Sequence, residues 1–273
     1  PDGNGGWIYN LQDVRRVVYR LPELLGQKAI LFCYSPDTEV LTRTGWVAFP
    51  DLHQADQVAQ YDLDGSIEFV SPTAYQHFDY DEDFLNLKSD WCDLLITPDH
   101  RLLTKCQRGN WRVRPATDVP CNAIFKTSGK YVGGLGVSPS PLQARLLAAY
   151  LGDGRLERGR RRSWNAKKGR KIQRLHKLLT ELSISFRSAP IESAPGWTQT
   201  VIWSTDATWL EDFTPLRQLQ WASLDWSFAA RRAFLDELRY WDGDSVGKVG
   251  LRFFTAKQAE AEIVTAMAAL SEM

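Results

Sequence analysis

A cysteine and a distant histidine have the side chains that acyl transfer requires. Cys33 begins the stretch Cys33–Thr42, and Thr97-Pro98-Asp99-His100 follows far downstream. A thiol is the most nucleophilic neutral side chain near pH 7, and a histidine can deliver a proton to a leaving nitrogen. Taken singly, such a cysteine is usually a buried apolar residue, such a histidine a turn residue, and Thr97 uninformative. The order and spacing of the two segments favour self-directed acyl chemistry instead.

The segment from Cys33 resembles the first block of an intein, and Ile96–His100 resembles its second block. The resemblance implies a Hint fold and the intein reaction, which needs no cofactor. Cys33 would attack the carbonyl of Phe32 and convert the Phe32–Cys33 amide to a thioester, while His100 protonates the departing nitrogen. Thr97 would hold the scissile peptide in a strained geometry. Asp99 would orient the loop or His100.

The far end departs from the intein pattern. An intein finishes with a His-Asn pair followed by Cys, Ser or Thr, and Leu270–Met273 contains no such pair. The chain also begins with Pro1 rather than Met. We therefore expect a fragment of a longer product that cannot complete splicing by itself.

Residues 1–32 differ in style from the sequence that follows them. The stretch Trp7–Phe32 resembles the segment that leads into the first strand of the toprim domain in primase-helicase-like proteins. Such a strand is normally followed by the catalytic Glu of the toprim fold, and the intein-like blocks stand in that place. This resemblance implies that residues 1–32 are an N-extein.

Two further segments each predict an apolar helix that ends in Asp-Gly, Leu146–Gly154 and Leu235–Gly243. One such segment alone is equally typical of a helix with a glycine cap. Two copies whose acids, Asp153 and Asp242, are 89 residues apart are more specific. Carboxylates are hard oxygen ligands for Mg²⁺, and two of them can place metal ions beside both scissile phosphates of a duplex.

These segments resemble the paired motifs of LAGLIDADG homing endonucleases. The resemblance implies two αββα halves, Asp153 and Asp242 as catalytic residues and metal ligands, Mg²⁺ as cofactor, and double-stranded DNA at the insertion site as partner. Arg239 and Tyr240 make the second helix less apolar than is usual in this family. An insert that kept its fold but lost catalysis is therefore an open alternative.

A basic run follows Asp153 directly. A solvated face would normally mix both signs of charge, whereas Glu157 is the only acid before Glu181. This density of positive charge favours a surface that follows phosphates. The predicted DNA-binding residues are Arg155, Arg158, Arg160, Arg161, Arg162, Lys167, Lys168, Arg170 and Lys171. The strands predicted at Thr198–Trp203 and Lys248–Phe254 are candidates for base reading, and Lys248, Lys257, Lys167 or Lys168 could lie near the scissile phosphate.

The elements that position these residues change in type along the chain. Turn signals about every ten residues predict an all-β module. Its strands are expected at Thr38–Leu41, Gly45–Phe49, Gln57–Tyr61, Ile67–Thr73, Asp83–Leu87, Leu94–Ile96, Arg101–Thr104 and Trp111–Arg114. A linker at Gly133–Pro141 separates it from helical periodicity at Leu142–Leu151 and Ile172–Leu182. We predict a multidomain α+β protein with an N-extein at 1–32, the N-terminal part of a Hint domain at 33–135 and an endonuclease domain at 136–273.

Composition agrees with a folded chain of more than one domain. The chain has 273 residues, 44% of them hydrophobic, and a net charge of zero. Residues 33–135 carry 9 Lys/Arg against 15 Asp/Glu, whereas residues 155–187 carry 12 against 2. The four cysteines, Cys33, Cys92, Cys106 and Cys121, form no Cys-x-x-Cys and are expected to be free thiols. No apolar run reaches the roughly 18–20 residues of a membrane span, so we expect a cytoplasmic protein.

Three readings of function remain. The favoured one is an intein that splices itself and contains an endonuclease, monomeric because both motifs lie in one chain. The second is a host replication protein of primase-helicase type that has a degenerate passenger intein. The third is a Hint-domain autoprocessor that only cleaves, although such proteins have no reason to contain paired LAGLIDADG helices.

Overall fold

The computed structural model describes residues 7–10, 34–72, 83–89, 92–133, 136–157, 161–246 and 250–273. The chain divides into two compact units. One, here unit 1, contains residues 132–271 and the N-terminal strand; the other, unit 2, contains the described residues from Tyr34 to Tyr131 and the last two residues. The predicted junction Phe32–Cys33 and the rest of the predicted extein apart from residues 7–10 lie outside the described residues. No helix among the residues described is long and apolar enough to cross a membrane.

Unit 2 is built from short strands, as the turn spacing predicts. Its strands are β2 (Glu39–Thr42), β3 (Gly45–Ala48), β4 (Val58–Tyr61), β5 (Ser66–Val70), β6 (Leu85–Ser89), β7 (Cys92–Ile96), β8 (Arg101–Lys105), β9 (Arg112–Pro115), β10 (Ile124–Phe125) and β11 (Lys130–Tyr131). Each of the eight strands predicted in this region overlaps an observed one. The expected β-rich module is confirmed at this level.

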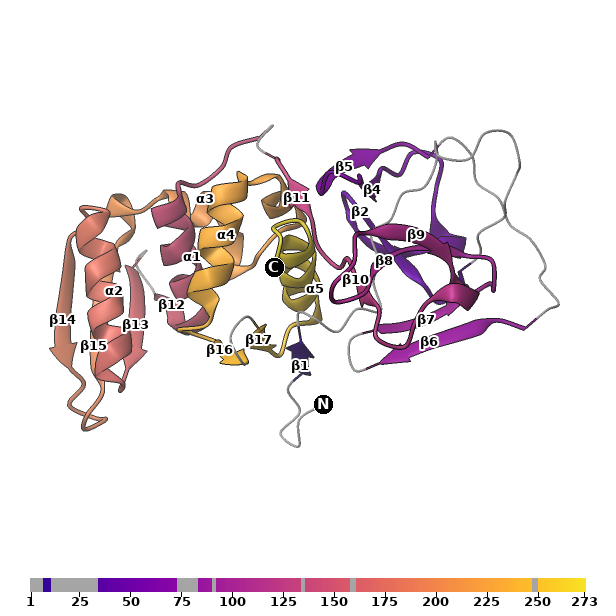
Figure 1. Cartoon of the computed structure of the whole chain (residues 1–273). Helices are drawn as coiled ribbons and strands as arrows, with labels where there is room; N and C mark the ends of the chain where they lie inside the picture. The colour runs from indigo at the N-terminus through magenta and orange to yellow at the C-terminus, as the bar shows by residue number, and fades with distance from the viewer. Residues whose placement is uncertain are drawn as a thin grey trace. The chain divides into compact units, whose positions relative to one another are not determined.

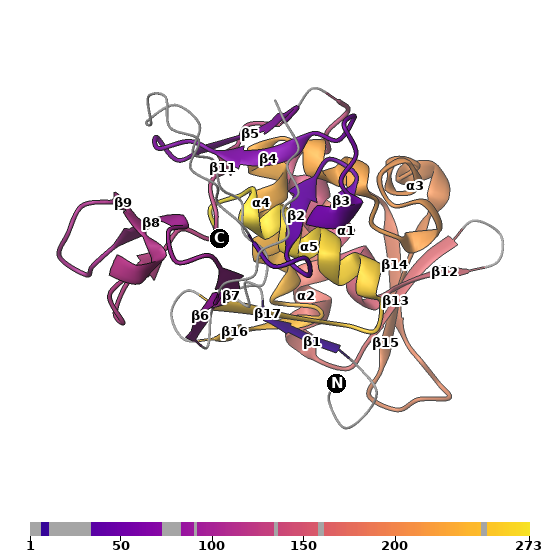
Figure 2. The same cartoon turned by 90° about the vertical axis from the view of Figure 1, so that its right-hand side faces the viewer.

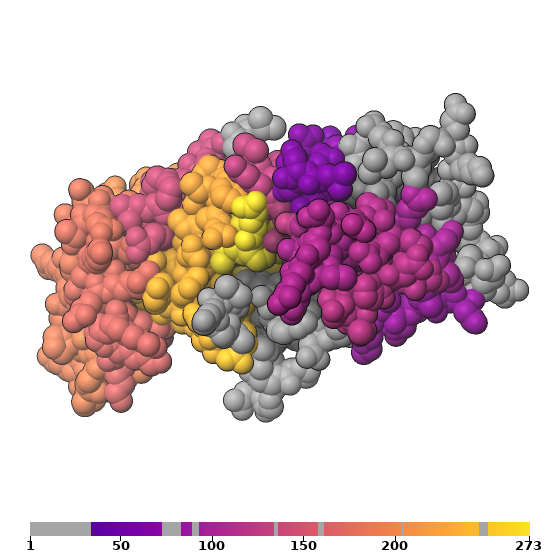
Figure 3. All heavy atoms as spheres, viewed as in Figure 1, coloured from indigo at the N-terminus to yellow at the C-terminus, as the bar shows by residue number. Residues whose placement is uncertain are grey.

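The strands of unit 2 form three sheets. Their orders are β11-β5-β4-β2-β3, β10-β8-β9 and β6-β7. A core of Leu94, Ile96, Leu102 and Ala116 lies between the second and third sheets. The strands β8 and β9 reach the surface on the face shown in Figure 3.

Unit 1 contains two successive groups of helices and strands. The first group is α1 (Pro141–Asp153), β12 (Gly154–Glu157), β13 (Arg161–Ala166), α2 (Gly169–Glu181), β14 (Phe186–Pro190), β15 (Thr198–Trp203) and α3 (Trp209–Phe213). The second is α4 (Phe228–Leu238), β16 (Gly243–Val246), β17 (Gly250–Thr255) and α5 (Gln258–Ala269). Each group begins with a helix followed by a β-hairpin and a second helix, and in the first group two more strands follow.

Each group has its own antiparallel sheet. The first is ordered β12-β13-β15-β14. In the second, β1 (Trp7–Asn10) pairs with β17, which pairs in turn with β16, and the three strands lie side by side in both views (Figures 1 and 2). Sequence analysis did not predict that residues 7–10 add a strand to this sheet.

Local sequence signals explain where α1 and α4 begin. Ser140 caps α1 by accepting from the N–H of Gln143, whose side chain accepts in return from the N–H of Ser140 at 2.8 Å. Ser227 caps α4 by accepting from the N–H of Ala230. Such caps satisfy backbone donors that the first helical turn leaves unpaired.

Candidate active sites

The helices α1 and α4 run in parallel and in matched register (Figure 1). At their starts, the N–H of Ser227 donates to Oγ of Ser138 at 2.9 Å, and these residues are 89 positions apart. At the far end, Asp153 is the last residue of α1, and Asp242 lies the same 89 positions further along the chain. The helix predicted at Leu235–Gly243 is wrong beyond Leu238, where α4 ends, so Asp242 follows the helix after a turn. The constant offset is what a structural repeat produces.

The ends of the two helices approach each other closely at Gly152. A Cβ atom on this residue would lie 2.9 Å from Cβ of Trp241 and 3.3 Å from Oδ2 of Asp242. Real Cβ contacts are almost never that short, so only glycine fits between the two chain segments. This close approach places the carboxylate of Asp242 beside the end of α1, where Asp153 is the last helical residue.

The two carboxylates differ in their surroundings. Nζ of Lys171 donates to Oδ2 of Asp153 at 2.5 Å and to the carbonyl of Trp241 at 3.1 Å. Burial raises the pKa of Asp242 to about 6, and the negative charge of Asp153 contributes to this rise, against the opposing effect of Lys171. A carboxylate whose pKa is raised by burial and by a neighbouring acid is typical of functional sites.

Arg217 completes the site from a segment that the sequence did not single out. Its guanidinium donates to the carbonyls of Tyr150, Leu151 and Gly152, at 2.6 Å in the last case. The carbonyl of Tyr150 also accepts from the N–H of Gly154, and a positive charge at this end of α1 interacts favourably with the helix dipole. Arg217 has a φ of 59°, a conformation that is costly for a residue with a side chain. A basic residue in an irregular segment gives no periodic signal, which is why sequence analysis missed it.

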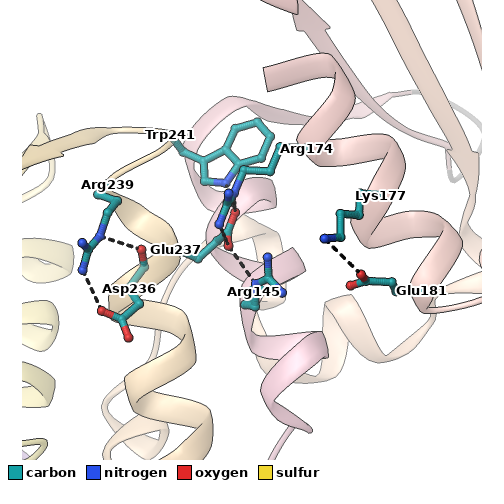
Figure 4. A network of polar contacts seen from close by, with 8 residues as sticks. All are labelled: Arg145, Arg174, Lys177, Glu181, Asp236, Glu237, Arg239 and Trp241. Carbon is teal, nitrogen blue, oxygen red and sulfur yellow. Dashed lines mark hydrogen bonds and ion pairs between the residues drawn. The ribbon is translucent and has the colours of Figure 1, made fainter. Parts of the chain in front are cut away.

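A buried carboxylate links three helices behind the acidic pair (Figure 4). Glu237 of α4 is only 1% exposed. It accepts from Arg145 of α1 at 2.8 Å, from both Nε and Nη2 of Arg174 of α2, and from the indole of Trp241 at 3.0 Å. Trp241 immediately precedes Asp242, so this network, the Glu237 clamp, fixes the backbone from which Asp242 extends. The sequence motif gives no indication of it.

Comparisons with known proteins return few relatives. No protein-family model matches the chain. It is 27% identical over 289 aligned residues to a ribonucleoside-diphosphate reductase subunit beta of Aquifex aeolicus (strain VF5), a match that spans 88% of this chain and 40% of the relative. It is 32% identical over 71 residues to an ATP-dependent Clp protease proteolytic subunit of Chlamydomonas moewusii, spanning 26% of this chain and 7% of that protein. The chain thus covers less than half of the length of either relative.

Among solved structures, mesophilic variants of the homing endonuclease I-DmoI match 47% of this chain and 75% of their own length at 18% identity, with a TM-score of 0.35. The structure of I-DmoI in complex with DNA and Mn matches 47% of this chain and 76% of its own length at 18% identity, with a TM-score of 0.34.

The basic residues predicted to bind DNA do not all lie on one exposed surface. Arg162 is 3% exposed and lies over the ring of Tyr150, so it belongs to the core of unit 1 and not to a phosphate-binding surface. Its position on β13 explains the error, because alternate residues of a strand face opposite sides. Lys171 is occupied by Asp153 and Trp241. Arg158 and Arg160 lie outside the described residues, as does Lys248.

The remaining basic residues are exposed. Arg155 and Arg161 project from β12 and β13, and the guanidinium of Arg161 lies 5.6 Å from the ring of Trp203 on β15. Lys167, Lys168 and Arg170 are exposed at the start of α2. The register of the sheet places Arg187 of β14 opposite Val201 and Arg161 opposite Trp203, on the same face. This face holds three arginines and an exposed tryptophan.

The acyl-transfer candidates of unit 2 meet around Tyr34. Cys33 lies outside the described residues, but Tyr34, which follows it, bridges to Ile96, which precedes Thr97. The ring of Tyr34 lies 4.3 Å from that of His100, centroid to centroid. The N–H of His100 donates to the carbonyl of Thr97 at 3.0 Å, and both side chains are buried. Thr97 Oγ1 is buried without a hydrogen-bond partner among the described residues.

The structure also bears on the other predicted residues of unit 2. Asp99 is exposed and occupies the turn between Thr97 and His100. Cys106 and Cys121 are free thiols, as expected, and the side chain of Cys92 lies outside the described residues. Since Tyr34 bridges to Ile96, the described part of the segment that begins at Cys33 lies beside the segment Ile96–His100.

Proposed function

We propose that unit 1 is a metal-dependent DNA endonuclease of the LAGLIDADG homing type. One observation supports this above the others: Asp153, the last residue of α1, lies close to Asp242, which follows the end of α4. Burial and the negative charge of Asp153 raise the pKa of Asp242, so ionised Asp242 is costly unless a cation offsets the repulsion. A site that binds a divalent cation gains from that arrangement.

The donor chemistry fits magnesium. No cluster of three or more His, Cys, Asp or Glu side chains suited to a metal occurs within the described part of the chain. Mg²⁺ is commonly bound by only one or two carboxylates together with water and substrate phosphates. Asp153 and Asp242 would hold it, and when bound it would activate water and stabilise charge on the phosphate.

The chain's own residues would prepare the site in defined ways. Lys171 neutralises Asp153 and positions the carbonyl before Asp242. Arg217 places positive charge at the end of α1, close enough to lower the pKa of Asp242. The face of the first sheet, with Arg155, Arg161 and Trp203, would contact the duplex, because cations interspersed with an aromatic ring suit a phosphate backbone and its bases.

A cleavage assay tests this proposal. The protein is incubated with a library of randomised duplexes in the presence of Mg²⁺ or Mn²⁺, and cut ends are sequenced. We expect defined double-strand cuts that Asp153→Asn and Asp242→Asn abolish. The matched control is Asp236→Asn, which removes an acid of α4 that lies outside the site. Cutting that survives both site substitutions would reject the assignment.

For unit 2 we propose the first step of protein splicing. The thiolate of Cys33 attacks the carbonyl carbon of Phe32, a C–S bond forms, the C–N bond to Cys33 breaks, and the nitrogen takes a proton from His100. The packing of Tyr34 against His100 and its bridge to Ile96 support this, because the peptide bond joins Tyr34 to Cys33. Thr97 Oγ1 would donate its free hydrogen bond at the junction.

The relatives support the idea of an insert with its own function. Two proteins named for unrelated reactions, a reductase subunit and a protease subunit, match this chain. Matches that cover 88% and 26% of the chain must overlap, so both relatives share one part of it. A mobile intein accounts for such sharing better than a host replication protein does.

Mass spectrometry tests splicing. The protein is expressed with its natural flanking sequence and treated with dithiothreitol, which should cleave a thioester and release residues 1–32. Cys33→Ala should prevent release, and Cys106→Ala, which removes another thiol of unit 2, should not. An intact precursor in every sample would reject this part of the proposal and favour a passenger domain.

A further inference from the structure

The charges of unit 2 are segregated along its sequence. Residues 34–100 contain 2 Lys/Arg and 14 Asp/Glu, whereas residues 101–131 contain 7 Lys/Arg and a single acid, Asp118. The net negative charge of the whole unit hides this separation. The basic stretch coincides with the sheet β10-β8-β9, which is distinct from the other two sheets of the unit.

Two of the lysines converge on one aromatic ring. Nζ of Lys105, from β8, lies 4.9 Å from the centroid of Trp111, and Nζ of Lys126, which follows β10, lies 5.2 Å from it. Lys126 is also 5.8 Å from the ring of Tyr61. A cation over an indole is favourable, but two cations beside the same ring repel each other.

No described acid offsets this repulsion. Among the residues that the structure describes, no acid forms an ion pair with any of six cations in this stretch: Arg101, Lys105, Arg108, Arg112, Arg114 and Lys126. A surface that only needs to be soluble normally mixes both signs. The middle of β8 is buried, but Arg108 and Arg112 are exposed, and Lys105 and Lys126 are half-buried.

We propose that this basic sheet, defined as β10-β8-β9 with Trp111, is a second nucleic-acid surface that binds a phosphate backbone. Its spacing of cations around a half-buried indole suits phosphates, with Trp111 available to stack on a base or sugar. The surface lies in the unit to which the splicing residues were assigned, and it is separate from the arginine face of unit 1. This proposal rests on the proposed function in one respect: the nucleic acid whose phosphates the basic sheet binds is taken to be DNA.

Binding, not cleavage, provides the test. Fluorescence anisotropy measures the affinity of the full chain, containing Asp153→Asn to prevent cutting, for a labelled duplex of about 30 bp between about 50 and 300 mM salt. The double variant Lys105→Ala with Lys126→Ala should bind several-fold more weakly. The slope of log K against log salt should fall by about 0.9 for each phosphate that the variant no longer neutralises. Lys105→Arg with Lys126→Arg should retain the slope of the parent.

A control in the same unit separates this effect from loss of net charge. Lys88→Ala removes a cation of β6 that pairs with Asp93 and should leave the slope unchanged. Unchanged affinity and slope in the double alanine variant would overturn the proposal. The proposal would also be overturned if the double alanine variant lost binding to polyglutamate but kept its binding to DNA, because the partner would then be an acidic protein.

The proposed endonuclease surface is tested in parallel. Arg161→Ala with Arg187→Ala should lower the slope independently. If only the unit 1 variant loses affinity, the basic sheet is not a binding surface. If only the unit 2 variant loses affinity, the basic sheet stands and the proposed DNA surface of unit 1 fails.

Discussion

Asp242 is the residue whose protonation differs most from that of an ordinary aspartate. Its pKa rises from the usual 3.8 to about 6 through burial and the neighbouring charge of Asp153. A raised carboxyl pKa means that the folded protein binds the proton more tightly than the unfolded chain. Ionised Asp242 therefore destabilises the folded protein. A cation bound beside it would offset this cost, as is expected at a functional site.

The resulting pH dependence is specific in sign and range. Between about pH 4 and pH 6 the unfolded chain loses this proton while the folded protein keeps it, so stability falls as pH rises through that window. Asp242→Asn should therefore raise the free energy of unfolding above pH 6 by up to ~3 kcal/mol, at 1.36 kcal/mol per pKa unit, and by much less near pH 4. Urea unfolding at both pH values measures this.

Asp236→Asn is the control, because Asp236 is half-exposed and paired with Arg239, and exposed pairs contribute little. An Asp242→Asn protein that is less stable than the parent at pH 8 would contradict the account.

At the residue scale the sequence predicts the acids but not the cations that surround them. Asp153 and Asp242 each follow an apolar helical run and precede a glycine, a pattern visible in one dimension. Arg217 reaches the site from a segment that nothing in the sequence marks. Lys171 belongs to the basic run that predicts DNA binding, and the run does not indicate that it contacts Asp153. Arg162 shows the reverse error, because a run of arginines does not reveal which of them a strand turns inward.

At the scale of elements, α1 and α4 are related by the repeat but are not equivalent. Adding the offset of 89 to Ala148 gives Glu237, and adding it to Arg145 gives Phe234. The ion pair joins Arg145 of α1 to Glu237 of α4. The positions that the repeat relates to these two residues, Phe234 of α4 and Ala148 of α1, are both uncharged. This ion pair fits only the association of α1 with α4. Two copies of α1 would place Arg145 opposite Ala148, and two copies of α4 would place Glu237 opposite Phe234, so a charge would be left without its partner.

The Glu237 clamp should be important for stability. Glu237→Ala would leave Arg145 and Arg174 without their carboxylate, and breaking a buried pair by removing one partner typically costs about 3–5 kcal/mol. Chemical denaturation measures the loss. Asp236→Ala, one residue earlier on α4, is the matched control and should cost below about 1 kcal/mol. Equal losses for the two variants would show that the buried network contributes nothing specific.

Gly152 sets the separation of the helix ends. In Gly152→Ala the added methyl would lie 2.9 Å from Cβ of Trp241, so the ends must move apart. We expect a loss of about 1–3 kcal/mol together with slower DNA cleavage, because Asp153 and Asp242 separate.

Gly169→Ala provides the comparison. A Cβ on Gly169, at the start of α2, meets no atom within 4 Å, and alanine is the better helix former. This variant should be as stable as the parent or slightly more stable. If Gly152→Ala behaved in the same way, the close approach of the helix ends would not be required.

The elements themselves were largely predictable. The eight strands of the β module, the helices α1 and α2 and the strand β15 follow from periodicity and turn residues, which are local signals. The pairing of β1 with β17 joins segments more than 240 residues apart in sequence. Register between distant strands depends on tertiary contacts, so no local pattern could indicate it.

At the scale of the whole molecule, each proposed site draws its described side chains from one unit. The carboxylates and the residues that contact them, Lys171, Arg217 and the Glu237 clamp, belong to unit 1, and Tyr34, Thr97 and His100 belong to unit 2. In the sequence, the change from β-type to helical periodicity lies close to the boundary between the two units at Tyr131 and Val132. Sequence analysis did not detect the segregation of charge within unit 2, because the net charge of the whole module averages its acidic and basic parts.

The two activities should therefore be separable by single substitutions. Asp153→Asn should abolish DNA cleavage and leave thioester formation at its parental rate, while Cys33→Ala should do the reverse. Each residue belongs to a different unit, so each change is expected to affect one reaction only. Both reactions can be measured on one preparation, the first by cut duplex and the second by thiol-induced release of residues 1–32. A Cys33→Ala protein that lost cleavage while keeping the parental melting temperature would show that the units are coupled and would remove the basis for treating them as independent.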